Sequence, residues 1–161
     1  MVSRTFKVEA PLKGGLILMA RPLGGERLDD EIAALKAQGV DAVLSLIERD
    51  EAAELDLSRE AEVCAAHGIA FHAFPIPDRG LPSDRSAFDN AMRALAGHVA
   101  GGAILAIHCR AGIGRTSVAA AGVLVQSGIP AMHALTLIGE ARGITVPDTE
   151  AQRAFILALD G

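Results

Sequence analysis

Tryptophan and tyrosine are absent from this sequence of 161 residues, and cysteine occurs only twice. Two cysteines, Cys64 and Cys109, exclude the disulfide framework on which many small secreted domains depend. The opening residues also lack the apolar core of a signal peptide. We therefore expect a cytoplasmic protein, and in a reducing compartment a lone cysteine beside a histidine points to catalysis.

Long apolar runs and clusters of positive charge are missing as well. No apolar stretch approaches the roughly twenty residues that a transmembrane helix needs. Lysine and arginine number 15 against 20 aspartates and glutamates, which gives a net charge of −5. Nucleic-acid backbones and anionic membranes both select a clustered positive face. Neither nucleic acid nor membrane is therefore an expected partner.

Apolar periodicity, interrupted by glycine and proline, divides the chain into alternating strands and helices. Such alternation predicts an α/β fold, in a single domain over residues 1–161, with a central, mostly parallel sheet of four or five strands flanked by helices. The expected strands are residues 15–20, 40–47, 69–76 and 103–107. The expected helices are residues 28–38, 50–67, 84–100 (with Ser83 as N-cap), 116–126, 131–142 and 149–159.

The segment from His108 to Thr116 follows a fully apolar strand and precedes a helix. Ligands of such sheets bind beyond the carboxyl ends of the strands, often at a helix N-terminus. Backbone N–H groups of a loop in this position can point at phosphate oxygens, and its glycines permit the close approach. We call it the cysteine loop, and its expected phosphate-binding residues are Arg110, Ala111, Gly112, Ile113, Gly114 and Arg115.

Each polar side chain of the cysteine loop has a chemical use. Cys109 lies where loop amides and the helix dipole favour an anion, so it should ionise readily and attack phosphorus. Arg115 offers a planar fork of donors for two phosphate oxygens. Thr116 can donate a hydrogen bond to the sulfur, and His108 can orient the loop through a backbone carbonyl. The pattern predicts a nucleophilic cysteine that handles phosphate.

The order His-Cys, five residues, Arg, Thr resembles the signature of the cysteine-based protein phosphatases. Residues 20–22 and 44–48 also resemble stretches of small bacterial and kinase-associated dual-specificity members, so the resemblance spans about residues 15–155. It implies the fold of that superfamily and a phosphomonoester hydrolase that works through a cysteinyl-phosphate. It also implies that neither a metal nor an organic cofactor is needed.

Two further catalytic residues follow from the same resemblance. The segment from Ile76 to Gly80, here called the acid loop, resembles the Trp-Pro-Asp loop of the family with Ile in place of Trp. This match makes Asp78 the general acid and later the base that activates water. Its alternatives are a turn residue that caps its own backbone and Asp84 as the acid. Gln152 resembles a glutamine that positions the attacking water; the alternative is an exposed helix residue.

The expected substrate is a phosphorylated protein or a small phosphomonoester, acted on by a monomer of protein-tyrosine or dual-specificity type. The lack of tyrosine suggests a shallow pocket that also admits phosphoserine and phosphothreonine. Inositol phosphates or phosphoinositides are the alternative substrates, and Arg142 is a candidate source of positive charge near the site. Two further alternatives are an inactive phosphoprotein-binding module and a rhodanese-like sulfur carrier.

Cys64 and the histidines outside the motif suggest two other roles. Cys64 is either a thiol that resolves oxidised Cys109 or a small buried helix residue. Cys64, His67 and His72 have a loosely metal-like spacing, but a zinc site needs four closely paired ligands. We therefore expect no metal site.

Overall fold

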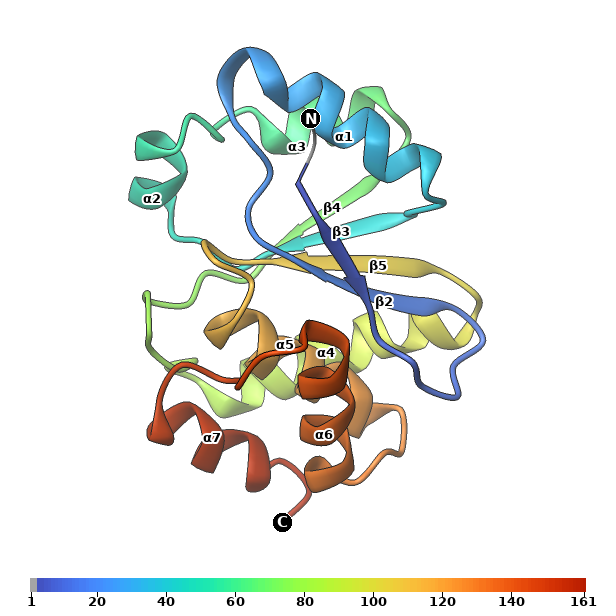
Figure 1. Ribbon diagram of the computed structural model, residues 1–161, viewed down its shortest axis with the longest axis vertical. Helices are drawn as coiled ribbons and strands as arrows, with labels where there is room; N and C mark the ends of the chain where they lie inside the picture. Colours follow the sequence, from blue (N-terminus) through green and yellow to red (C-terminus); the bar gives the residue numbers. More distant parts are fainter. Residues whose placement is uncertain (1–2) are drawn as a thin grey trace.

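A computed structural model describes residues 3–161 as one sheet between two layers of helices (Figure 1). The strands and helices alternate along most of the chain, as the sequence predicts. In chain order they are β1 (Thr5–Lys7), β2 (Gly15–Met19), a short 3-10 turn (Gly25–Arg27), α1 (Leu28–Ala37), β3 (Ala42–Ser45), α2 (Arg49–Glu54), α3 (Glu60–Ala66), β4 (Ala70–Ala73), α4 (Arg85–Ala100), β5 (Ile104–His108), α5 (Gly114–Gln126), α6 (Ala131–Arg142) and α7 (Glu150–Leu157).

The sheet has five strands in the order β1-β2-β5-β3-β4. Strands β2, β5, β3 and β4 run parallel, and only β1 is antiparallel to its neighbour, with Phe6 opposite Leu18. The predicted mostly parallel sheet is therefore confirmed. Strand β5 lies between β2 and β3, so the end of β5 and the cysteine loop after it emerge at the centre of the sheet's carboxyl edge.

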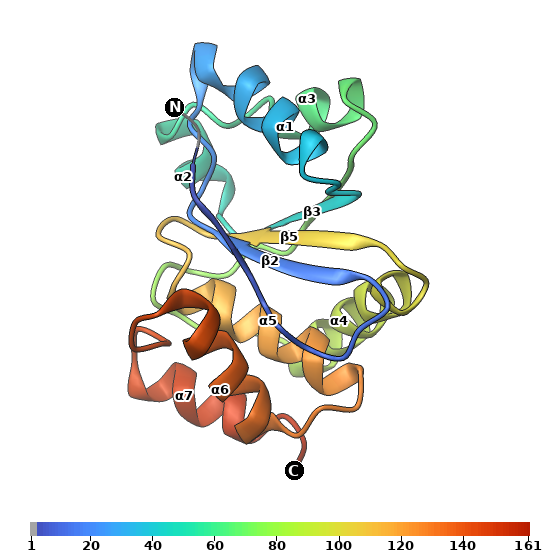
Figure 2. The same cartoon turned by 45° about the vertical axis from the view of Figure 1, so that its right-hand side comes forward.

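Helices α1 and α3 cover one face of the sheet, and α4 to α7 cover the other (Figures 1 and 2). Because side chains alternate along a strand, Leu16 and Leu18 of β2 enter the core beneath α4 to α7, whereas Ile17 and Met19 enter the core beneath α1 and α3. The sheet is thus apolar on both faces. Among the described residues, no helix has the length and apolar character needed to cross a membrane.

Three differences from the sequence prediction have identifiable physical causes. Residues 50–67 form two helices, not one, because the chain turns between them at Asp56, whose φ of 58° is left-handed. The N-cap of α4 is Asp84, which accepts a hydrogen bond from the Ala87 amide, and not Ser83. Strand β1 was not predicted, since its three residues lack a strand pattern and are fixed by pairing with β2.

Candidate active site

The cysteine loop joins the end of β5 at His108 to the start of α5 at Gly114. Gly112 has a φ of 75°, in the left-handed region that favours glycine. A Cβ atom at this position would lie 2.6 Å from the Met19 carbonyl carbon and oxygen. The loop therefore wraps tightly against the end of β2 only because residue 112 is glycine.

The Cys109 sulfur is buried and hydrogen-bonded within the loop. Sγ accepts the backbone N–H of Gly112 at 3.3 Å and the hydroxyl of Thr116 at 3.0 Å. The Thr116 hydrogen bond expected from the sequence is thus confirmed. Both donors favour a negatively charged sulfur, and the N-terminal end of α5 adds its dipole in the same sense.

Arg115 is held by three partners although its side chain is only 2% exposed. Glu51 binds the end of the guanidinium with both carboxylate oxygens, at 2.6 Å from Nη1 and 2.9 Å from Nη2. Nη1 also donates to the Ile76 carbonyl at 3.0 Å, and Nη2 to Asp78 at 3.1 Å. Four of the five N–H donors are therefore engaged, and within the described chain the Nε–H has no partner.

Charge around Arg115 favours its protonated form. Burial opposes that charge, but the Glu51 hydrogen bond and the negative charges of Cys109, Glu51 and Asp78 outweigh the burial and raise the pKa of Arg115. Glu51 responds in the opposite direction. Burial would raise the pKa of Glu51, yet hydrogen bonds from Arg115 and the Glu48 amide, with the charges of Arg115 and Arg110, lower it.

Asp78 lies beside the cysteine loop, as the sequence suggests. Its side chain is 57% exposed and 3.1 Å from Arg115. The acid loop turns at this point: Arg79 has a φ of 59°, and the Gly80 amide donates to the Pro77 carbonyl at 2.7 Å. The rival candidate Asp84 is occupied as the N-cap of α4. The geometry therefore brings Asp78, and not Asp84, to Arg115.

Gln152 is fully buried, so the alternative of an exposed helix residue is wrong. Its Oε1 accepts the amides of Asp148 and Thr149 at 3.1 and 3.2 Å, and its Nε2 donates to the Gly80 carbonyl at 3.1 Å. A Cβ atom on Gly114 would come within 3.0 Å of the Gln152 amide. Gln152 thus joins the start of α7 to the acid loop and lies against the cysteine loop.

His108 makes the loop contact expected from the sequence and a second one that was not expected. Nδ1 lies 3.2 Å from the Cys109 carbonyl, and Nε2 lies 2.7 Å from the Glu60 carboxylate. Arg142 was also placed correctly near the site, since its Nε donates to the Gly112 carbonyl at 3.0 Å. The side chain of Arg110 lies 3.5 Å from both Glu51 and Glu54.

Glu51 and Glu60 are the two site residues that the sequence prediction missed. They lie 64 and 48 residues from their partners Arg115 and His108. One signal could have indicated Glu51, because it follows β3, a neighbour of β5, and the carboxyl ends of parallel strands meet at one edge. Glu60 follows no strand directly, and no comparable signal marks it.

Cys64 is a buried residue of α3, and burial together with the Glu60 charge raises its pKa to about 12. It belongs to the core on the α1 side of the sheet, whereas Cys109 belongs to the core on the other side. The arrangement therefore favours a packing role over a resolving thiol. In residues 3–161 no group of three or more histidine, cysteine or acidic side chains is placed to hold a metal ion.

The fold and the arrangement of the site are those of the cysteine-based dual-specificity phosphatases. A kinase associated phosphatase, with serine in place of its catalytic-site cysteine, has the same fold with a TM-score of 0.87 at 20% identity, over 97% of this chain and 93% of that one. The chain belongs to the family described as "Polymorphic toxin system, DSP-PTPase phosphatase", whose model matches residues 17–129.

Two further solved structures extend this comparison. Tk-PTP in its active form has a TM-score of 0.72 at 26% identity, over 94% of this chain and 98% of that one. PTPMT1 in complex with PI(5)P also has a TM-score of 0.72, at 18% identity, over 90% of this chain and 89% of that one. No curated protein matches the sequence at a significant level.

Proposed function

We propose that this protein hydrolyses phosphomonoesters through a cysteinyl-phosphate on Cys109, and that its substrates are phosphorylated proteins. One observation carries the proposal: a buried sulfur accepts hydrogen bonds from Gly112 and Thr116 beside a guanidinium with an unoccupied Nε–H. A nucleophile, an anion-binding loop and a forked cation thus meet within one short segment. Electrostatic stabilisation by these groups is the largest expected contribution to catalysis.

In the first step the Cys109 thiolate attacks phosphorus, so that an S–P bond forms and the ester P–O bond breaks. The phosphate takes the edge of Arg115 formed by Nε and Nη2, and this displaces Asp78 from its 3.1 Å contact with Nη2. Asp78 then faces the leaving oxygen and gives it a proton. Glu51 remains on the opposite end of the guanidinium and keeps Arg115 in position.

In the second step water attacks the cysteinyl-phosphate, Asp78 takes the proton of that water, and the sulfur leaves as a thiolate. The Thr116 hydroxyl, 3.0 Å from Sγ, stabilises the departing sulfur. Gln152 Nε2 holds the acid loop through Gly80, and its second hydrogen is the group that would position the water. Loop, cation and acid therefore act in both steps.

A phosphorylated protein is the preferred substrate for two reasons. A solved structure described as "Protein Tyrosine Phosphatase (putative)" from Leishmania major has the same fold, with a TM-score of 0.73. The chain also lacks tyrosine, the residue that lines the deep pocket of tyrosine-specific relatives, which supports a shallow site that accepts phosphoserine and phosphothreonine too. We further propose that the protein is a monomer. We also propose that it is cytoplasmic, because a catalytic thiolate persists in a reducing compartment.

A substrate with a second anionic group is the other candidate, and two arginines favour it. The guanidiniums of Arg142 and Arg4 lie 4.1 and 5.1 Å from the Phe6 ring centroid. Within residues 3–161 neither has a carboxylate at ion-pairing distance, and burial together with the Arg4 charge lowers the pKa of Arg142. Two cations without a carboxylate partner, one of them bonded to the Gly112 carbonyl, would suit an inositol phosphate with more than one phosphate.

Hydrolysis of an aryl phosphate at mildly acidic pH, under reducing conditions, tests the proposal. Wild-type protein should turn over, and Cys109→Ser should not, although it should still bind vanadate or phosphate. An inactive wild type that binds phosphopeptides would support the binding-module alternative, and sulfur transfer from thiosulfate would support the rhodanese alternative. Comparing phosphopeptides with inositol phosphates, in wild type and Arg142→Ala, then separates the two substrate classes.

A further inference from the structure

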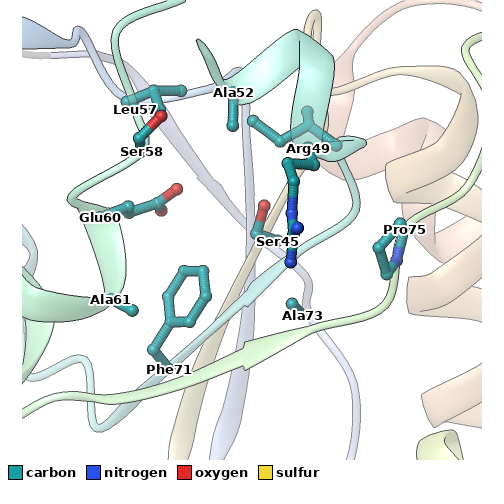
Figure 3. Close-up of a pocket in the computed structure, with 11 residues that line it drawn as sticks. Ser45, Arg49, Ala52, Leu57, Ser58, Glu60, Ala61, Phe71, Ala73 and Pro75 are labelled. Atoms are coloured by element: carbon teal, nitrogen blue, oxygen red, sulfur yellow. The ribbon is translucent and has the colours of Figure 1, made fainter.

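A pocket of about 420 Å³ lies on the face of the sheet that α1 and α3 cover (Figure 3). Its lining residues Ile47, Leu57 and Phe71 belong to the core on that face, whereas Cys109 belongs to the core on the other face. Ligand pockets have volumes of about 300–1,000 Å³ and combine apolar walls with a few convergent polar groups. The pocket therefore has the size of a ligand site and is separate from the catalytic one.

The Ser45 side chain in this pocket is buried and polar, with no partner among the described residues. Ser45 is only 3% exposed, yet its hydroxyl makes no hydrogen bond within residues 3–161. No fully buried side-chain nitrogen or oxygen in the described chain lacks a partner, so the Ser45 hydroxyl must face open space. Figure 3 shows it directed into the pocket. An unpaired polar group in a closed site costs free energy, which indicates a ligand with a hydrogen-bonding atom.

Arg49 and Glu60 extend into the same pocket from opposite sides, with the Phe71 ring between them (Figure 3). Arg49 forms no ion pair with any carboxylate that the structure describes, so its donors are available to a ligand. Glu60 directs Oε2 to the His108 ring at 2.7 Å, which leaves Oε1 to accept a hydrogen bond. The pocket therefore offers donors on one side, an acceptor on the other and a flat apolar surface between them.

We infer that this pocket binds a guanine base. Guanine carries two acceptors, O6 and N7, side by side, and a bidentate arginine is the commonest specific partner of that pair. The other edge of the ring carries the donors N1–H and N2–H2, which suit the free oxygen of Glu60. The Ser45 hydroxyl can donate to O6, and the ring can stack on Phe71. Each polar group of the pocket then has a partner.

Other classes of ligand match fewer of these groups. A wholly apolar molecule would leave Arg49, Ser45 and Glu60 unpaired in a closed site. An inorganic anion would bind Arg49 but would use neither the Phe71 ring nor the acceptor on Glu60. Adenine has a donor, its N6 amino group, next to N7, and this donor would lie against those of Arg49. Guanine is therefore the base that the pocket favours.

Calorimetric titration of the intact protein with guanosine tests the inference. Adenosine is the matched probe. It should bind about ten- to a hundredfold more weakly, since a bidentate arginine contact discriminates between bases by that much. Absence of guanosine binding at millimolar concentration would overturn the inference, and so would equal binding of the two nucleosides.

Single substitutions identify the side chains that bind. Arg49→Ala should weaken guanosine binding about ten- to a hundredfold, with Tm unchanged because Arg49 is exposed. Arg59→Ala is the matched control, since Arg59 is 74% exposed and pairs with Glu62; it should bind guanosine normally. Ser45→Ala should weaken binding several-fold and keep Tm, because its hydroxyl has no partner in the described chain. Wild-type affinity in Arg49→Ala would place guanosine elsewhere and contradict the proposal.

Two further titrations separate this pocket from the catalytic site. Cys109→Ser, and wild type saturated with inorganic phosphate, should both bind guanosine as the free wild type does. Competition between phosphate and guanosine would place the nucleoside at Cys109, and the inference would be wrong. Neither measurement needs turnover, so a failure to hydrolyse aryl phosphate would refute the proposed function and leave this test unaffected.

Discussion

Replacing Glu51 by glutamine tests whether Arg115 needs a carboxylate on its far end. Glutamine has nearly the same size and keeps one oxygen acceptor. It removes the negative charge and one of the two hydrogen bonds, now 2.6 and 2.9 Å long, that fix the guanidinium. The change leaves a buried cation with only one carboxyl partner in the described chain, Asp78, whose side chain is 57% exposed.

The structure sets the size of the expected effect. Removing one partner of a buried pair costs about 3–5 kcal/mol, and the retained hydrogen bond and Asp78 should reduce this to about 2 kcal/mol. For a chain of this length that is a fall in Tm of roughly 4–8 °C. One charge-assisted hydrogen bond in the active arrangement is worth about 1.5–3 kcal/mol. The value of kcat/KM should therefore fall about ten- to a hundredfold.

Steady-state hydrolysis of an aryl phosphate and thermal unfolding provide the measurements. Glu54→Gln is the matched control, because Glu54 lies on the same helix, is 71% exposed and pairs with Arg110 at the longer distance of 3.5 Å. It should behave as the wild type in both assays. If Glu51→Gln kept wild-type kcat/KM, Arg115 would be positioned by the loop backbone alone and the role given to Glu51 would be wrong.

The pH dependence of stability gives a second measure of the same contact. The pKa of Glu51 is lowered in the folded protein, so its stabilising effect is fully present above the pKa of the unfolded chain. That effect is lost as the pH falls through the lower, folded pKa. The stability difference between wild type and Glu51→Gln should therefore be constant near neutral pH and shrink in acid. Denaturant unfolding at several pH values measures it.

Three other changes have distinct expected outcomes. Asp78→Asn should lower kcat by about two to four orders of magnitude, most for poor leaving groups. Tm should change little, because the Asp78 side chain is 57% exposed and Glu51 still binds Arg115. Unchanged kinetics would mean that Asp84, and not Asp78, is the acid. Gly112→Ala should abolish vanadate binding, because its Cβ would lie 2.6 Å from the Met19 carbonyl; retained binding in a calorimetric titration would contradict the loop geometry. Iodoacetamide should label Cys109 and spare Cys64, whose pKa is raised to about 12, until denaturant exposes both; peptide mass spectrometry distinguishes them.

The parts of the fold that local pattern controls were predicted well. Largely apolar runs predicted β2, β3 and β5, and glycine or proline breaks placed the ends of α1 and α6 correctly to within a residue. Short-range chemistry also sufficed for the Thr116 contact with Cys109, because both residues belong to one loop whose shape the glycines restrict. Local sequence is therefore sufficient to predict the central strands of the sheet and the cysteine loop at the centre of the site.

The contacts that Glu51 and Glu60 make across the carboxyl edge of the sheet were not predicted from the sequence. The carboxylates of Glu51 and Glu60 come from helices that look alike in sequence, Ala-rich and acidic, and were predicted as one. The turn at Asp56, with its left-handed φ of 58°, sends the two helices in different directions and so gives each glutamate a different partner. The position after β3 is the one sequence signal for Glu51, and none marks Glu60, because tertiary packing decides which of the nearby glutamates reaches the site.

The buried Gln152 has a consequence for how much of the chain the catalytic apparatus requires. The family match ends at residue 129, and every atom of the cysteine loop lies before that point. Yet the acid loop is fastened at the Gly80 carbonyl by an amide from α7. A fragment trimmed to the matched region would retain the nucleophile and the cation but lose this fastening. We expect such a fragment to be slow in the steps that need Asp78, so the last two helices belong to the minimal enzyme.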